Sequence, residues 1–430
     1  RTPSSARTFN PQGTNPRPDW GPRSLGAMHS PWPRRASRVL LSMALAAVLP
    51  RFAASATIPI TSDADLRAAV AGLANGDVLA LAAGVYSGAS ACSILVSGGR
   101  NVTLSGSSNP PPEIDCGSSG RHLDVSGGAI VRLVGITLRN GAADNGGCLR
   151  VAGVNTAVHL INSRVSLCTA SNSGGGFHAS GGATVVFQGG TVELCSASAN
   201  GGGGYVDGAS IFVRAQSQIV QNSAGGDGAG LCAVGASSVA LQQSSLSSNA
   251  AARDGGGLFL LGSALVVADS SLSLNRGTIN GGAIRAASMS TITLSGSTSI
   301  DRSTALRGAG LRVTDSTMTL SGPVVLRDNT AYGSGSVVLA TASSLTIPAS
   351  VRLSGNRVPG EWDVTATCSN EPKTNAAFDN AIVQEGGACS SLCVTGFYEQ
   401  MPATGDLVSG GACVPCDASA CPVGQYRGAC

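Results

Sequence analysis

The stretch GGGLFLLGSALVVADSSLSLN, residues Gly255–Asn275, decides the fold. It opens on a glycine cluster, closes on an asparagine and holds three short apolar runs in which every second residue is apolar. Alternation with a period of two indicates a strand that has one buried face. This stretch therefore predicts three short strands joined by three tight turns.

A version of this stretch returns every 26 to 28 residues. The repeats start at Gly146, Gly174, Gly202, Gly228, Gly255, Gly281, Gly308 and Gly335. A second ladder, at the residue that closes each repeat, has the same period and comprises Cys168, Cys195, Asn222, Asn249, Asn275, Ser303, Asn329 and Asn356. Two ladders with one period indicate a solenoid in which each repeat forms one coil.

The predicted fold is all-β: a right-handed, three-sided parallel β-helix over residues 57–360. Stacked coils lie about 4.8 Å apart, so every strand pairs with the coils on both sides and apolar side chains form one inner column. Glycine and asparagine tolerate the backbone of tight corners, and we interpret both ladders as corner positions. A helix that begins at Ser62 as its cap and stops at Asn75-Gly76 is expected to close the N-terminal end.

The GGAI motif at Gly281 and the apolar-x-x-Asn spacing resemble the repeats of the polymorphic outer-membrane protein family, which are adhesin-type domains. More broadly they resemble right-handed β-helices of the pectin-lyase-like superfamily, as does EIDCG at Glu113–Gly117. The resemblance implies either adhesion or cleavage of polysaccharides. Cysteine in place of asparagine at positions 168 and 195 departs from the repeat pattern.

The first 56 residues read as targeting sequence. Residues 1–27 are interpreted as a disordered leader, and residues 28–56 combine a basic start, an apolar run and small residues at Ala54–Ala56, as a secretory signal does. A membrane anchor and an organelle transit peptide are the alternatives. We therefore expect a secreted or cell-surface protein, with a candidate N-glycosylation site at Asn101 in Asn-Val-Thr.

The chain has 13 cysteines, as expected for a disulfide-bonded exported protein. Residues 361–388 are interpreted as a linker or C-terminal cap, and residues 389–430 as a cysteine-rich module that resembles ephrin-receptor-like and tumour-necrosis-factor-receptor-like modules. Zinc at Cys413 and Cys416 is the rival reading of that module. Any membrane anchor is expected beyond Cys430.

Charge excludes one class of partner. Charged residues make up 12% of the chain and the net charge is +3, without a dense basic run in its middle, so we expect no nucleic acid partner. No cofactor or metal site is predicted.

The position next to each glycine motif is expected to point outward and to form one row across the coils. The predicted row reads Arg150, His178, Val206, Cys232, Phe259, Arg285, Arg312 and Leu339, without a carboxylate. Asp207, Asp227 and Asp254 are interpreted as turn residues on different corners, and His122, His159 and His178 as isolated side chains that are solvated or hydrogen-bonded. Arg150, His178, Arg285 and Arg312 form the candidate ligand face, on which stacked arginines would favour an anionic glycan.

These observations favour a non-enzymatic protein for adhesion or recognition, with an extracellular glycan or protein as its ligand. A secreted polysaccharide lyase or glycoside hydrolase is the alternative, and a structural wall or coat protein is the third reading. Two carboxylates within about 10 Å of each other would favour hydrolysis.

Cys168 and Cys195 are predicted to form a disulfide, because equivalent residues on neighbouring coils lie about 5 Å apart between Cα atoms. Two buried free thiols are the alternative.

Overall fold

The computed structural model describes residues 55–357, except 63, 336 and 349, and the backbones of five short strands in the tail. The predicted leader, residues 28–54 of the predicted signal segment, and the side chains of the predicted linker and cysteine-rich module lie outside the described residues. No helix in the described part has the length and hydropathy needed to span a bilayer.

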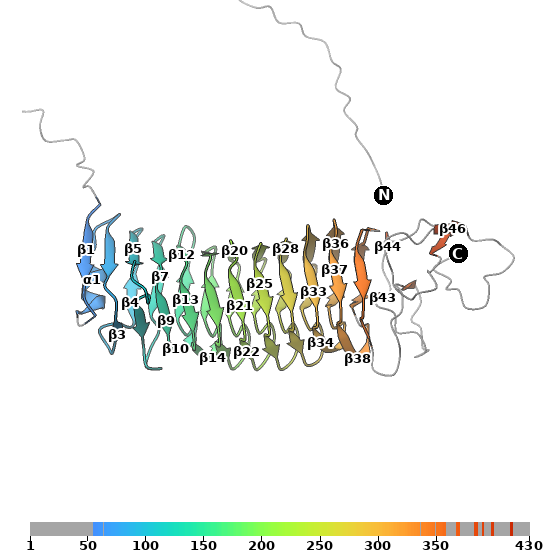
Figure 1. The fold of residues 1–430 in the computed structure, drawn as a ribbon, viewed down its shortest axis with the longest axis horizontal. Helices are drawn as coiled ribbons and strands as arrows, with labels where there is room; N and C mark the ends of the chain where they lie inside the picture. Colours follow the sequence, from blue (N-terminus) through green and yellow to red (C-terminus); the bar gives the residue numbers. More distant parts are fainter. Residues whose placement is uncertain are drawn as a thin grey trace, which may run out of the picture. The chain divides into compact units, whose positions relative to one another are not determined.

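The chain forms a parallel β-solenoid, as predicted, in which each coil adds one strand to each of several sheets (Figure 1). The coil that contains the quoted stretch shows the plan: β27 (Leu258–Leu261), β28 (Ala264–Ala268), β29 (Ser271–Ser273) and β30 (Arg276–Gly277) belong to four different sheets. We name these sheets C, A, B and D. All strand pairs between coils are parallel.

Sheet A is the longest of the four, with 13 strands. Its strands, in spatial order, are β1 (Thr57–Ile60), β2 (Val78–Leu81), β5 (Asn101–Gly106), β8 (Ile130–Val134), β12 (Ala157–Ile161), β16 (Thr184–Gln188), β20 (Ser210–Arg214), β24 (Ser238–Gln242), β28, β32 (Thr291–Ser295), β36 (Thr317–Ser321), β40 (Ser344–Thr346) and β44 (Cys389–Ser390).

Sheet B has 11 strands, each of three residues. They are β3 (Val85–Ser87), β6 (Glu113–Asp115), β9 (Thr137–Arg139), β13 (Arg164–Ser166), β17 (Thr191–Glu193), β21 (Gln218–Val220), β25 (Ser245–Ser247), β29, β33 (Ser299–Asp301), β37 (Val325–Arg327) and β41 (Arg352–Ser354).

Sheet C has 12 strands and begins each repeat after its glycine motif. They are β4 (Ile94–Val96), β7 (Leu123–Ser126), β11 (Leu149–Ala152), β15 (Phe177–Ser180), β19 (Gly204–Asp207), β23 (Leu231–Val234), β27, β31 (Ile284–Ala287), β35 (Leu311–Thr314), β39 (Val338–Thr341), β43 (Ile382–Glu385) and β42 (Thr367–Ser369). Elsewhere in the tail, β45 (Phe397–Glu399) and β46 (Cys413–Pro415) form an antiparallel pair.

Sheet D corrects the predicted three-sided coil, because a fourth strand lies between sheets B and C. Several of its eight strands have only two residues, too short for the alternation that predicted the others. They are β10 (Ala142–Asn145), β14 (Thr169–Ser173), β18 (Ser196–Ala197), β22 (Ser223–Ala224), β26 (Ala250–Ala251), β30, β34 (Thr304–Arg307) and β38 (Thr330–Ser334).

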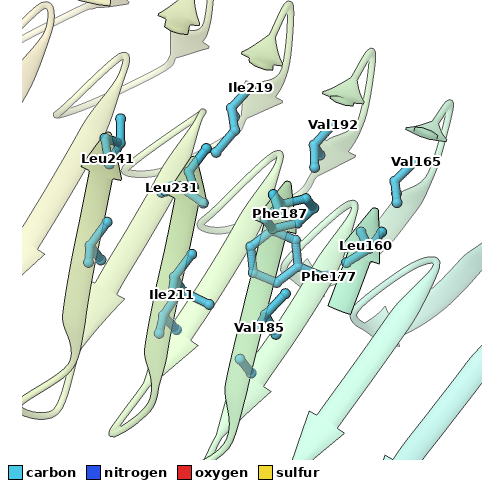
Figure 2. Close-up of a cluster of buried hydrophobic side chains, with 14 of the residues drawn as sticks. Leu160, Val165, Phe177, Val185, Phe187, Val192, Ile211, Ile219, Leu231 and Leu241 are labelled. Atoms are coloured by element: carbon cyan, nitrogen blue, oxygen red, sulfur yellow. The ribbon is translucent and has the colours of Figure 1, made fainter. Parts of the chain in front are cut away.

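The core is one continuous column of inward side chains, as the alternation predicts. Figure 2 shows part of it, where Phe177 and Phe187 lie side by side with ring centroids 5.4 Å apart. The Phe177 ring reaches under the next coil, where a Cβ at Gly204 would lie 2.1 Å from the ring. A large side chain on one coil is thus accommodated by a glycine on the next.

The N-terminal helix is present but starts later than predicted. Helix α1 spans Leu66–Gly72, and its N-cap is Asp65, whose carboxylate accepts a hydrogen bond from the Ala68 N–H at 2.9 Å. Ser62 is therefore not the cap, since it lies a full turn before the first helical residue. Leu66 and Val70 are buried, as expected for a helix that closes a solenoid end.

The asparagine ladder stacks coil on coil, as predicted. The Asn249 amide donates to Ile219 O at 3.0 Å and to Asn275 Oδ1 at 3.1 Å, and its own Oδ1 accepts the Asn222 N–H at 3.0 Å. Asn249 is fully buried. The ladder therefore satisfies corner backbone groups that water cannot reach.

The structure does not contain the predicted Cys168–Cys195 disulfide: Cys168 is bonded to Cys148, with a Cα–Cα distance of 5.6 Å, and Cys195 is a buried free thiol. The reason is that each ladder side chain points at the third residue of the glycine motif that opens its own coil. A Cβ at Gly203 would lie 3.1 Å from Asn222 Nδ2. Cys148 occupies this third position in the coil that Cys168 closes.

A second disulfide, which the repeat pattern did not indicate, joins Cys92 and Cys116 near the N-terminal end. Its Cα–Cα distance is 5.7 Å.

Candidate functional site

The predicted ligand-face residues lie in one outward row of sheet C. Parallel pairing places Arg150 beside His178 and Arg285 beside Arg312. Eight consecutive positions of this row, here called the sheet C row, are Asp124, Arg150, His178, Tyr205, Cys232, Phe259, Arg285 and Arg312, and the register continues to Leu95 at one end and Leu339 at the other.

Tyr205, not Val206, belongs to the row. Val206 is fully buried in the core, and Tyr205 pairs with His178 on one side and Cys232 on the other. The sequence has four consecutive glycines at residues 201–204, and the prediction took Gly202 as the start of this repeat. The glycine equivalent to Gly174 and Gly228 is instead Gly201. A slip of one residue moves every side chain of a strand to the opposite face.

The row is not uniformly exposed, because the glycine turn folds back over part of it. Gly228 has φ +65°, and a Cβ there would lie 2.8 Å from Cys232 Cβ. Cys232 is 1% exposed, and Leu339, which the prediction also placed in this row, is 2% exposed. Neither residue can contact a ligand without movement of the turn, and burial also raises the pKa of the Cys232 thiol.

The row does contain a carboxylate, which corrects the prediction. Asp124 lies beside Arg150 and binds it at 3.1 Å, and Arg121 approaches the same carboxylate at 3.2 Å. Arg121 also donates to the backbone O of Gly146 at 2.9 Å. The charges at this end of the row are therefore partly paired.

Aromatic rings occupy the middle of the row. His178 and Tyr205 are stacked, with ring centroids 5.3 Å apart and an interplanar angle of 21°. Burial, with the nearby Arg150, lowers the pKa of His178, so the ring is neutral at pH 7. Burial, followed by the effects of Cys232 and Asp207, raises the pKa of Tyr205, so its hydroxyl is protonated.

The two arginines at the other end are held by the next coil. Arg285 donates to Thr314 Oγ1 at 3.0 Å, and Arg312 makes the equivalent bond to Thr341 Oγ1 at 2.8 Å. Arg285 Nε also lies 3.6 Å from Asp254 Oδ2. These contacts fix both guanidinium groups along the sheet surface.

Asp227 and Asp254 lie on one corner, not on different corners as predicted. The Asp254 N–H donates to Asp227 Oδ1 at 3.1 Å, and Asp254 Oδ1 accepts the Asn280 N–H at 3.1 Å. Asn200 makes the same bond to the Asp227 N–H at 2.8 Å. Burial raises the pKa of Asp227, against the opposing effect of Arg253. The stack forms a second polar ladder that the sequence analysis missed.

The remaining predicted residues lie elsewhere. His159 is on the outer face of sheet A, where partial burial and the neighbouring Arg132 and Arg214 lower its pKa. Asn101 is on the same face, with Oδ1 bonded to Arg132 at 2.5 Å. His122 is fully buried and bonds Ile114 O through Nε2 at 2.9 Å. None of these three belongs to the sheet C row.

Comparison of the chain with protein-family models, with curated proteins and with solved structures finds no significant match to any of them. The resemblance to pectin-lyase-like and adhesin repeats thus remains an interpretation of motifs, and the function must be argued from this chain's own residues.

Proposed function

We propose that the chain is a non-enzymatic recognition protein that binds an extended glycan along the sheet C row. The observation that supports this proposal is the regular spacing of the row, in which seven of the eight side chains from Asp124 to Arg312 are at least partly exposed and only Cys232 is buried. Coils about 4.8 Å apart give the row a regular repeat. Such an array fits a polymer of repeating units better than a compact ligand.

The chemistry of the row suits a neutral glycan better than the anionic one that stacked arginines suggested. Arg150 is paired with Asp124, and Arg285 lies 3.6 Å from Asp254. Tyr205 and Phe259 supply half-buried aromatic surface, which packs against the apolar C–H groups of a sugar. Guanidinium and tyrosine hydroxyl groups supply hydrogen bonds for sugar hydroxyls.

A panel of immobilised polysaccharides tests this proposal. The full chain should bind at least one neutral, extended glycan, with little dependence on salt because few unpaired charges take part. Binding only to anionic glycans, with affinity that falls steeply as salt rises, would contradict the neutral assignment. Binding to a protein surface and to no glycan would contradict the ligand class.

Hydrolysis is the second candidate, because Asp227 and Asp254 are carboxylates on consecutive coils and Asp227 has a raised pKa. Glycoside hydrolysis requires such a pair, one as acid and one as base or nucleophile. However, asparagine occupies the same corner on the two flanking coils: Asn200 Oδ1 accepts the Asp227 N–H, and Asn280 donates its backbone and side-chain N–H groups to Asp254 Oδ1. A ladder that accepts either amide or carboxylate favours a structural role for both aspartates.

An assay for reducing ends separates the two functions. If binding is the function, a glycan that binds the chain is recovered uncut, and Asp227→Asn leaves its affinity unchanged. Release of reducing ends by the chain, abolished in Asp227→Asn, would establish hydrolysis instead.

Export to the cell surface is part of the same proposal and rests on residues 28–56 and on the acceptor pattern at Asn101. Secretion of a reporter fused behind residues 28–56, cleaved after Ala56, is the expected result. A reporter that stays inside the cell would contradict it.

A further inference from the structure

Three cysteines and one histidine meet at a buried corner that has no part in the sheet C row. Cys148 and Cys168 form the disulfide, and Cys195 holds its free thiol on the ladder position one coil further on. The Cys195 side chain is 1% exposed and the other two cysteines are fully buried, as is His122. External thiols therefore cannot reach these sulfur atoms in the folded chain.

His122 presents an unpartnered nitrogen to this cluster. Its Nε2 donates to Ile114 O at 2.9 Å, so in the neutral ring Nδ1 carries the lone pair. Nδ1 is buried and has no hydrogen-bond partner. A Cβ placed on Gly141 would lie 2.7 Å from Cys148 Sγ and 2.9 Å from His122 Nδ1, so both atoms border the same small space. His122 and Cys148 are also neighbours across coils, since the His122 N–H donates to Cys148 O at 3.0 Å.

Cys195 lies against Cys168 on the other side. The Ser196 N–H bonds Cys168 O at 2.9 Å, which places the two cysteines one coil apart. Cys195 Sγ lies 3.2 Å from Glu193 O on its own coil and 3.9 Å from Val165 O on the preceding coil, to which the ladder asparagines also reach. Equivalent residues on neighbouring coils lie about 4.8 Å apart, which is within the Cα–Cα range that a disulfide spans. Cys168 therefore has a candidate sulfur partner on each side.

We propose that Cys148, Cys168 and Cys195 form an internal disulfide-exchange site in which His122 accepts a hydrogen bond from the released Cys148 thiol. Cys195, as a thiolate, attacks Cys168 Sγ. The Cys168–Cys195 bond forms, the Cys148–Cys168 bond breaks, and the proton lost by Cys195 ends on Cys148. No electrons are gained or lost, so the exchange needs no external oxidant or reductant.

The surroundings of each sulfur atom determine the equilibrium constant and the rate of the disulfide exchange. The released Cys148 thiol gives His122 Nδ1 the donor that it lacks, which favours the exchanged form. Burial raises the pKa of Cys195 to about 12, so the attacking thiolate is scarce at neutral pH and the exchange is slow. The exchange therefore moves the covalent link. Instead of joining two positions within one coil, the disulfide joins the ladder positions of two neighbouring coils, as the asparagine hydrogen bonds do on later coils.

Disulfide mapping of the full chain tests this inference. The protein is incubated without added thiol at pH 7 and pH 9, quenched in acid, alkylated under denaturing conditions and cleaved after arginine and glutamate. Cleavage after Glu193 separates Cys168 from Cys195, which no arginine does. Both the 148–168 and the 168–195 peptide pairs are expected, with the second forming faster at pH 9.

Four variants make the result decisive. Cys195→Ser should give only the 148–168 pair, and Cys232→Ser, which removes the buried thiol outside the cluster, should behave as the parent. Cys148→Ser, refolded in the presence of a diazene so that the oxidant reaches the thiols before they are buried, should give the 168–195 pair. His122→Leu should lower the ratio of the 168–195 pair to the 148–168 pair roughly tenfold, because the acceptor for the Cys148 thiol is lost.

Two results would overturn the proposal. One is a parent chain that keeps only the 148–168 pair at pH 9, together with a folded Cys148→Ser variant in which Cys168 and Cys195 are both alkylated as free thiols. The other is a Cys168 that pairs with a cysteine of the tail. Circular dichroism of each variant distinguishes these results from misfolding.

Discussion

The imidazole of His122 occupies the space that a side chain at position 141 would fill. A Cβ on Gly141 would lie 2.9 Å from His122 Nδ1 and 2.7 Å from Cys148 Sγ. His122 holds the position equivalent to Cys148, and Gly141 holds the ladder position of the same coil, equivalent to Cys168. The same two positions meet as Cys148 with Cys168 and as Gly203 with Asn222. In each coil this corner therefore holds one large side chain, either at the third position of the glycine motif or at the ladder position, or it holds two side chains that are covalently bonded.

Gly141→Ala should destabilise the solenoid, because the added methyl group collides with a buried ring and a disulfide sulfur that cannot withdraw. We expect a loss of about 1–3 kcal/mol in the free energy of unfolding, measured by urea denaturation. Gly72→Ala is the matched control, since a Cβ at Gly72 meets nothing within 4 Å, and it should be neutral or slightly stabilising. Equal effects of the two changes would contradict this account of the corner.

Asn249→Ala should cost about 3 kcal/mol, because it leaves the Ile219 carbonyl and the Asn222 N–H without partners in a buried corner. Ser273→Ala on the outer face of sheet B is the control and should change stability by less than about 0.5 kcal/mol. Hydrogen exchange should show lost protection on the coils next to Asn249 first. Uniform loss along the whole solenoid would argue against coil-by-coil coupling through the ladder.

The free energy of unfolding should decrease as the pH falls, over the pH range in which His122 titrates in the folded and unfolded chains. Burial lowers the pKa of His122 to about 4, against an ordinary value of 6.5. Between these two pH values the unfolded chain binds a proton that the folded chain excludes, so the contribution is complete above pH 6.5 and is lost as pH falls through 4. The full effect is about 3 kcal/mol.

Urea denaturation at several pH values from 7.5 to 4 measures this slope. His122→Leu should flatten it, whereas His159→Gln, which changes a half-exposed histidine, should retain most of it. A parent chain whose stability does not change between pH 6.5 and 4.5 would show that His122 is not held neutral.

Much of the fold could be predicted from the sequence because the repeat constrains it twice, through alternation within strands and through the period between coils. The ladder from Asn222 to Asn356 could be predicted for the same reason. Sheet D could not, since strands such as Ser196–Ala197 are too short to show a period. The prediction placed Val206 in the row instead of Tyr205, because a run of four glycines does not show which glycine begins the repeat.

The Cys148–Cys168 pairing could not be predicted either, because the period aligns equivalent positions and says nothing about which different positions face each other. The stack of Asp227 on Asp254 has the same origin: the residue before each glycine motif varies between aspartate and asparagine, and only the backbone shows that these residues share a corner.

The most direct test of the proposed function compares Tyr205→Ala with Phe212→Ala in binding a neutral glycan identified on the polysaccharide panel. Tyr205 lies in the middle of the sheet C row, whereas Phe212 is an aromatic residue 41% exposed on the outer face of sheet A. Titration calorimetry with the full chain should show affinity lowered roughly tenfold or more by Tyr205→Ala and unchanged by Phe212→Ala. Unchanged affinity in Tyr205→Ala, or a greater loss in Phe212→Ala, would contradict the assignment of sheet C as the ligand face.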